Sequence, residues 1–193
     1  VYAYTNGEEA ELFLNGKSLG KRKKGVDKPF HKVDFAVWDG SDFYTPYRLL
    51  WEVPYESGEL KVVAYRDGQA VAEKVVTTAG KAARIRLTPD RSMIDADGQD
   101  LSYITVEILD KKGNLCPLSD KLVEFEVSGA GVLKAVGNGN AATTASFQDN
   151  KRKAFSGTCM LIIQSLESEA GEIEVKASSK GLKSAKVILQ SKK

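Results

Sequence analysis

The stretch Ile104-Thr105-Val106-Glu107-Ile108-Leu109 decides the fold class, because apolar and polar side chains alternate along it until a turn at Lys112-Gly113-Asn114. Strict alternation is typical of a strand with one buried face. Similar short segments recur along the chain, separated by turn dipeptides such as Asn15-Gly16 and Asp67-Gly68. Short strands at intervals of about 8–12 residues are typical of sandwiches and barrels. The sequence therefore predicts an all-β protein.

Other segments alternate in the same way: Leu49 to Val53, Leu60 to Ala64, Val123 to Val127, Ile173 to Ala177 and Ala185 to Leu189. One candidate helix, Ser119 to Phe125, overlaps the third of these segments, and we expect a strand there because the alternation is stronger. Trp51 alternates with Leu49 and Val53, so we expect it in the core.

A small, polar segment at residues 77–83 follows a completed strand and precedes a new alternating run. We place a domain boundary there, which gives domains of residues 1–80 and 81–193. An immunoglobulin-like sandwich has roughly 100 residues. The sequence thus predicts two tandem immunoglobulin-like antiparallel β-sandwiches.

Composition excludes several classes of function. The 193 residues are 42% hydrophobic and 28% charged, as in ordinary globular proteins. No apolar run approaches the ~18 residues of a membrane helix, so we expect no membrane partner. A formal net charge of +2 gives no reason to expect nucleic acid. One histidine and two cysteines are too few for a clustered metal site, and we expect neither metal nor cofactor.

The first residues look like the middle of a strand, because Tyr2 and Tyr4 alternate directly after Val1. We therefore expect a piece of a longer protein. The lack of a leader sequence then says nothing about export.

The first half carries three motifs: Val1 to Asn6, Glu11 to Gly20 and Leu50 to Leu60. Together they resemble a domain that follows the catalytic barrel in glycoside hydrolase family 2, which includes β-galactosidases of Bacteroides-type bacteria. The second half carries four more: Leu87 to Ser92, Asp97 to Leu101, Gly137 to Asn140 and Lys151 to Gly157. These resemble the final domain of the same enzymes. Through Val106 to Asp110, the second half is also similar to invasin-type bacterial immunoglobulin-like modules.

The resemblance implies a non-catalytic accessory region of an exported family 2 glycosidase of β-galactosidase type, in the periplasm or at the cell surface. Both catalytic carboxylates of that family lie on the barrel, so no catalytic residue is expected in this chain. The implied partner is the barrel of the same parent chain, and we also consider a homo-oligomer of the parent. Two alternatives stay open: a carbohydrate-binding module pair and an immunoglobulin-like stalk of a surface adhesin.

Four aromatic residues are candidates for carbohydrate contact: Trp38, Tyr44, Tyr47 and Tyr55. Aromatic rings stack on the apolar faces of sugars, and nearby polar groups bind hydroxyls. Packing of this segment on its own sandwich, or on the barrel, is the other interpretation.

A second candidate surface surrounds the basic run at residues 151–153, which Phe147 and Phe155 flank. The resemblance covers this region. We expect Asn138, Asn140 and Arg152 to dock on another domain of the parent enzyme.

Some polar groups have a structural interpretation instead. Asp95, Asp97 and Asp100 lack the spacing of a calcium loop, and we expect an Asp-Gly turn. Glu172 and Glu174 share one strand face, which we expect to be solvated.

The remaining charged and sulfur-bearing groups also have structural interpretations. The basic run Lys21 to Lys24 is typical of a protected edge strand. Cys116 and Cys159 are expected to be two free thiols.

Overall fold

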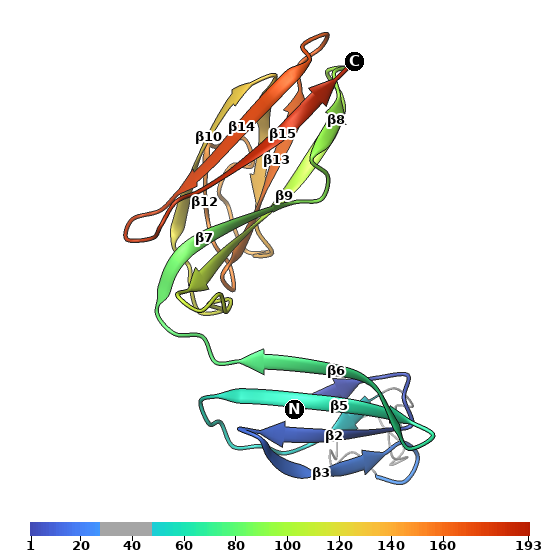
Figure 1. The fold of residues 1–193 in the computed structure, drawn as a ribbon. Coiled ribbons are helices and arrows are strands. Elements are labelled where there is room, and N and C mark those ends of the chain that lie inside the picture. The colour runs from blue at the N-terminus through green and yellow to red at the C-terminus, as the bar shows by residue number, and fades with distance from the viewer. Residues whose placement is uncertain (28–47) are drawn as a thin grey trace, which may run out of the picture. The chain divides into compact units, whose positions relative to one another are not determined.

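The computed structural model describes residues 1–27 and 48–193, and every regular element in them is a strand (Figure 1). The chain splits into two compact units, Val1–Thr78 and Ala79–Lys193, where the sequence placed the boundary after residue 80. Nearly all strand pairs are antiparallel, which confirms the predicted all-β class. The described residues include no helix able to span a membrane.

The described residues of the first unit form six strands: β1 (Tyr2–Tyr4), β2 (Glu9–Leu14), β3 (Lys17–Lys23), β4 (Arg48–Leu50), β5 (Glu59–Arg66) and β6 (Gln69–Thr77). They form a four-stranded sheet in the order β3-β2-β5-β6 and a two-stranded sheet, β1-β4. The core contains Ala3, Ala10, Leu12, Leu49 and Trp51.

The two predicted tight turns join neighbouring strands of the larger sheet. Asn15 and Gly16 have φ angles of 51° and 79°, and Asp67 and Gly68 have φ angles of 49° and 76°. Positive φ at both central residues is the requirement of a type I′ hairpin, which Asn-Gly and Asp-Gly satisfy. The turn chemistry read from the sequence therefore sets the β2-β3 and β5-β6 pairings.

Trp51 lies in the core of the first unit, as predicted, with 3% of its surface exposed. Its indole Nε1 donates a hydrogen bond of 3.0 Å to the carbonyl oxygen of Gly20. A buried indole needs such an acceptor because an unpaired N–H is costly away from water. Trp51 thus fastens the residues after β4 to β3.

The second unit contains nine strands: β7 (Ala82–Pro89), β8 (Met93–Asp95), β9 (Leu101–Asp110), β10 (Leu122–Gly129), β11 (Gly131–Gly137), β12 (Lys151–Lys153), β13 (Thr158–Ser165), β14 (Gly171–Ser178) and β15 (Ala185–Lys192). They form a five-stranded sheet, β12-β10-β14-β15-β8, and a four-stranded sheet, β11-β13-β9-β7. Only β8 pairs in parallel, with β15.

The core of the second unit confirms the alternation that decides the fold. Ile104, Val106 and Ile108 are fully buried along β9. Phe125 is buried in β10, so the overlapping helical interpretation is wrong. The two sheets bury one face each, as strand alternation requires.

Asp110, the last residue of β9, is a buried carboxylate with 3% of its surface exposed. Its Oδ2 accepts hydrogen bonds from the Gly80 N–H at 2.8 Å and from Nδ2 of Asn114 at 3.1 Å. Its Oδ1 accepts one from the Asn114 N–H at 2.9 Å. These donors, Gly80 first, hold the pKa of Asp110 well below its usual range. The carboxylate thereby pins the start of the second unit.

Candidate functional site

Three of the four candidate sugar contacts, Trp38, Tyr44 and Tyr47, lie outside the described residues. The fourth, Tyr55, lies between β4 and β5 with 85% of its surface exposed. The role of these four residues in carbohydrate contact stays a prediction.

The structure brings the three docking candidates to one end of the second unit. Arg152 is the central residue of β12, and only 2% of it is exposed. Its Nη2 donates hydrogen bonds to the carbonyl oxygens of Val136, at 2.9 Å, and Ser146, at 2.6 Å. Its Nη1 donates to the carbonyl oxygen of Ala145 at 3.3 Å. The guanidinium is therefore engaged inside its own domain.

Arg152 fastens the segment between β11 and β12, which contains no strand of its own. Its Cζ lies 5.2 Å from the ring centroid of Phe147, within range of a cation–π contact. Since a buried guanidinium is costly without acceptors, the carbonyl oxygens and the charge stabilise each other. A docking partner would therefore contact the segment that Arg152 holds in place, and not the buried Arg152 itself.

Both asparagines form part of that segment's internal hydrogen bonding. Nδ2 of Asn138 donates to the carbonyl oxygen of Lys153 at 2.8 Å, and its Oδ1 accepts from the Asn140 N–H at 3.1 Å. Oδ1 of Asn140 accepts from the Ala142 N–H at 3.0 Å. Such local bonds shape a turn without a helix or a strand. These hydrogen bonds define the turn, and its docking role stays a prediction.

Large apolar side chains gather at the same end of the unit. Phe147 is 59% exposed and Phe155 is 44% exposed. A Cβ added to Gly139 would lie 3.7 Å from the ring of Phe155, so the asparagine turn and this ring are neighbours. The Gly157 N–H donates to the carbonyl oxygen of Ser119 at 3.1 Å, which joins the Phe155 turn to the segment before β10.

That neighbouring segment adds two more apolar residues, Leu115 at 37% exposure and Leu118 at 98%. We call Leu115, Leu118, Phe147 and Phe155 the end patch. Isolated exposed apolar residues are common, but a group of large ones at one end of a domain is typical of an interaction surface. The sequence motif indicated Phe147 and Phe155, whereas nothing in the sequence grouped the two leucines with them.

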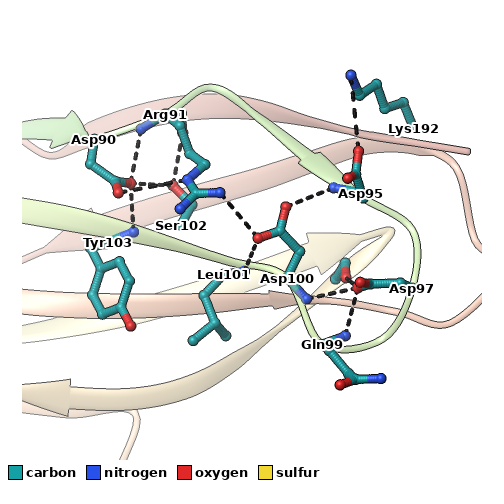
Figure 2. A network of polar contacts seen from close by, with 11 residues as sticks. Asp90, Arg91, Asp95, Asp97, Gln99, Asp100, Leu101, Ser102, Tyr103 and Lys192 are labelled. Carbon is teal, nitrogen blue, oxygen red and sulfur yellow. Dashed lines mark hydrogen bonds and ion pairs between the residues drawn. The ribbon is translucent and has the colours of Figure 1, made fainter.

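The acidic residues near β8 are engaged by donors of the protein itself (Figure 2). Asp97 accepts hydrogen bonds from the N–H groups of Gln99, at 2.8 Å, and Asp100, at 2.7 Å, which lower its pKa. Asp100 in turn accepts from the Asp95 N–H at 2.9 Å. Residues 1–27 and 48–193 contain no group of acidic, histidine or cysteine side chains able to hold a metal. Gly98 has a φ angle of 73°, so the hydrogen bonds to Asp97 close the predicted Asp-Gly turn.

The two cysteines are free, as predicted, and both are buried. Burial raises the pKa of the Cys159 thiol to about 12. The outer carboxylates also have a structural role: Glu174 lies 3.0 Å from the ammonium of Lys186 on the solvated face of β14. These residues belong to the framework of the sandwich.

Comparison with known proteins decides the family. Residues 85–188 match the model of glycoside hydrolase family 2 C-terminal domain 5. The chain belongs to this family. Residues 1–72 match a domain of unknown function, DUF4982. The resemblance to C-terminal domains of family 2 glycosidases is thus confirmed.

Individual relatives of this family 2 chain are much longer than it is. Beta-galactosidase BoGH2A of Bacteroides ovatus is 44% identical over 182 residues, which is 94% of this chain and 19% of the relative. A putative beta-glucuronidase of Formosa agariphila is 31% identical over 169 residues, covering 86% of this chain and 15% of the relative. The chain therefore spans less than a fifth of the length of these two relatives.

Two solved glycosidase structures have the same fold. A glycosyl hydrolase family 2 member from Bacteroides cellulosilyticus is 40% identical, with a TM-score of 0.84 over 100% of this chain and 22% of that one. A beta-glycosidase from Bacteroides vulgatus is 28% identical, with a TM-score of 0.83 over 98% of this chain and 22% of that one.

Proposed function

We propose that the chain is a non-catalytic accessory region of a longer, exported family 2 glycoside hydrolase of β-galactosidase type. The 44% identity to a protein named beta-galactosidase supports the substrate class. That relative continues well beyond the match, since the chain covers 19% of it. The rest of the parent enzyme carries the catalytic barrel, and this region braces it. Placement in the periplasm or at the cell surface rests on the resemblance alone.

The observation that carries the bracing role is the end patch. Removing apolar surface from water stabilises a protein by about 25 cal/mol per Å². Contact of the two phenylalanines and two leucines of the end patch with another domain would therefore be favourable. Arg152 fixes the segment on which Phe147 lies through buried hydrogen bonds to main-chain carbonyls. A rigid apolar surface of this kind binds a partner at little cost in conformational entropy.

The end patch is tested in the full-length enzyme. We expect Phe147→Ser with Phe155→Ser to lower the melting temperature of the barrel while leaving the isolated chain folded. Ile188→Ser is the matched control, because Ile188 is exposed to a similar degree, 41%, on the outer face of β15. Equal effects of the patch and control variants on the enzyme would refute the bracing role.

Glycan binding remains a second candidate function because of exposed tyrosines in the first unit. Tyr55 is 85% exposed, and the rings of Tyr2 and Tyr4 have centroids 6.5 Å apart on β1. Affinity electrophoresis of the 193-residue chain through soluble polysaccharides tests this. Retardation that Tyr55→Ala abolishes would support glycan binding, and unretarded migration in a panel of galactose-containing polysaccharides would argue against it.

A further inference from the structure

Strand β6 is an exposed edge strand within the part of the chain that the structure describes. It is the last strand of its sheet, and all nine of its residues, Gln69–Thr77, are exposed. Val71, Val75 and Val76 have exposed fractions of 50%, 38% and 60%. Within residues 1–27 and 48–193, no strand pairs with its outer edge.

The side of β6 that should face the core is exposed as well. Val76 pairs with Leu60, and Lys74 pairs with Val62. Opposite residues of an antiparallel pair point to the same face, and Leu60 and Val62 pack against the core of the first unit. Among the described residues, the core of this unit therefore covers β5 but not β6.

The opposite edge of the same sheet is built quite differently. β3 (Lys17–Lys23) is interrupted by a register shift opposite Leu12, where Gly20 has a φ angle of 96°. Lys21 and Lys23 form ion pairs with Glu9 at 3.7 and 3.6 Å. Lysines and bulges are the usual means by which proteins prevent pairing at a sheet edge.

β6 has little of this protection along most of its length. Its register shift lies at the hairpin end, so that Ala72 to Thr77 pair regularly with β5. Glu73 and Lys74 are its only charged residues, and neither forms an ion pair with another described residue. A regular edge with exposed valines is a template for one more strand.

We propose that β6 is completed by a strand from the part of the parent polypeptide that lies outside residues 1–193. This inference rests on the proposed function, and the length of the relatives supports the occupant, since the matched region is 19% of one and 22% of another. Val75 and Val76 point to opposite faces, so the added strand carries apolar side chains on both faces. We expect the added strand to carry an acidic side chain beside Lys74, with which it would form an ion pair.

Amide hydrogen exchange at single-residue resolution tests the pairing. In the 193-residue chain, alternate amides of Ala72 to Thr77 should exchange fast, because only alternate N–H groups of an edge strand point outward. In the full-length enzyme the same amides should slow at least tenfold, while those of β3 keep their rates. Unchanged rates in the full-length enzyme, or slow exchange already in the 193-residue chain, would overturn the proposal.

A charge introduced on β6 gives a second, independent test. Val75→Lys with Val76→Lys should lower the melting temperature of the full-length enzyme but not that of the 193-residue chain. Ile188→Lys, on an exposed face of the second unit, is the matched control. No difference between the β6 variant and the control in the full-length enzyme would count against the added strand. A parent protein without a catalytic barrel would instead refute the proposed function. Failure of the β6 pairing and failure of the proposed function are therefore distinguishable.

Discussion

The guanidinium of Arg152 donates a hydrogen bond of 2.9 Å to the carbonyl oxygen of Val136, where only 2% of the arginine is exposed. Val136 lies in β11 and Arg152 in β12, so the bond joins the two strands on either side of the segment that contains Phe147. Further bonds to Ala145 and Ser146 fix that segment between them.

Replacing Arg152 should therefore destabilise the second unit. Arg152→Ala leaves buried carbonyl oxygens without donors, and we expect a loss of about 2 kcal/mol or more in the free energy of unfolding. Arg152→Lys keeps the charge but offers a single ammonium in place of the planar fork, so an intermediate loss is expected. Urea titration followed by far-UV circular dichroism measures the free energy of unfolding of both variants. Wild-type stability of Arg152→Ala would contradict this role.

Asp110 should make stability depend on acidity. Its pKa in the folded state lies below the ordinary value of about 3.9, so its contribution is complete above that pH. As the pH falls through the folded-state pKa, the contribution is lost. Asp110→Asn should be less stable than wild type at neutral pH, and the difference should shrink in acid. A pH-independent difference between the two urea midpoints would show that the charge is irrelevant.

The cysteines should resist thiol reagents while the protein is folded. Burial raises the pKa of the Cys159 thiol to about 12, and burial followed by the charge of Asp110 raises the pKa of Cys116. Only the thiolate reacts, so labelling with an aromatic disulfide at mildly alkaline pH should be slow. Both thiols should react quickly in urea. Fast labelling of one thiol in the native protein would reveal local opening at that cysteine.

Gly129 should tolerate no side chain. Its φ angle is 91°, and an added Cβ would lie 2.0 Å from the carbonyl oxygen of Glu172. Gly181 has a φ angle of 79° with nothing within 4 Å, so Gly181→Ala carries only the backbone strain, about 1–2 kcal/mol. Gly129→Ala should cost clearly more in thermal unfolding. Equal melting temperatures would mean that the β10-β11 turn can shift.

Much of the fold was predictable because strand burial has a period of two. The alternation around Val106 and Phe125 gives the strands and their buried faces, and the chemistry of Asn15-Gly16 gives a turn. Those signals are local in the sequence. They say which side of a strand is buried but not which strands end a sheet, so the open edge of β6 could not be anticipated.

The candidate site was only partly predictable. Lys151, Arg152 and Lys153 look alike in sequence, yet the alternation of a three-residue strand turns Arg152 inward and both lysines outward. Asp110 gave no signal either, because its partners are mainly main-chain N–H groups brought together by the fold. Tertiary contacts of this kind leave no periodic trace in the chain.

The most direct test of the accessory role is hydrolysis of p-nitrophenyl β-galactoside by three proteins: the 193-residue chain, the full-length parent, and the parent lacking this region. We predict no release of p-nitrophenol by the chain, turnover by the parent, and a lower melting temperature for the truncated enzyme. Turnover by the 193-residue chain itself would contradict the account.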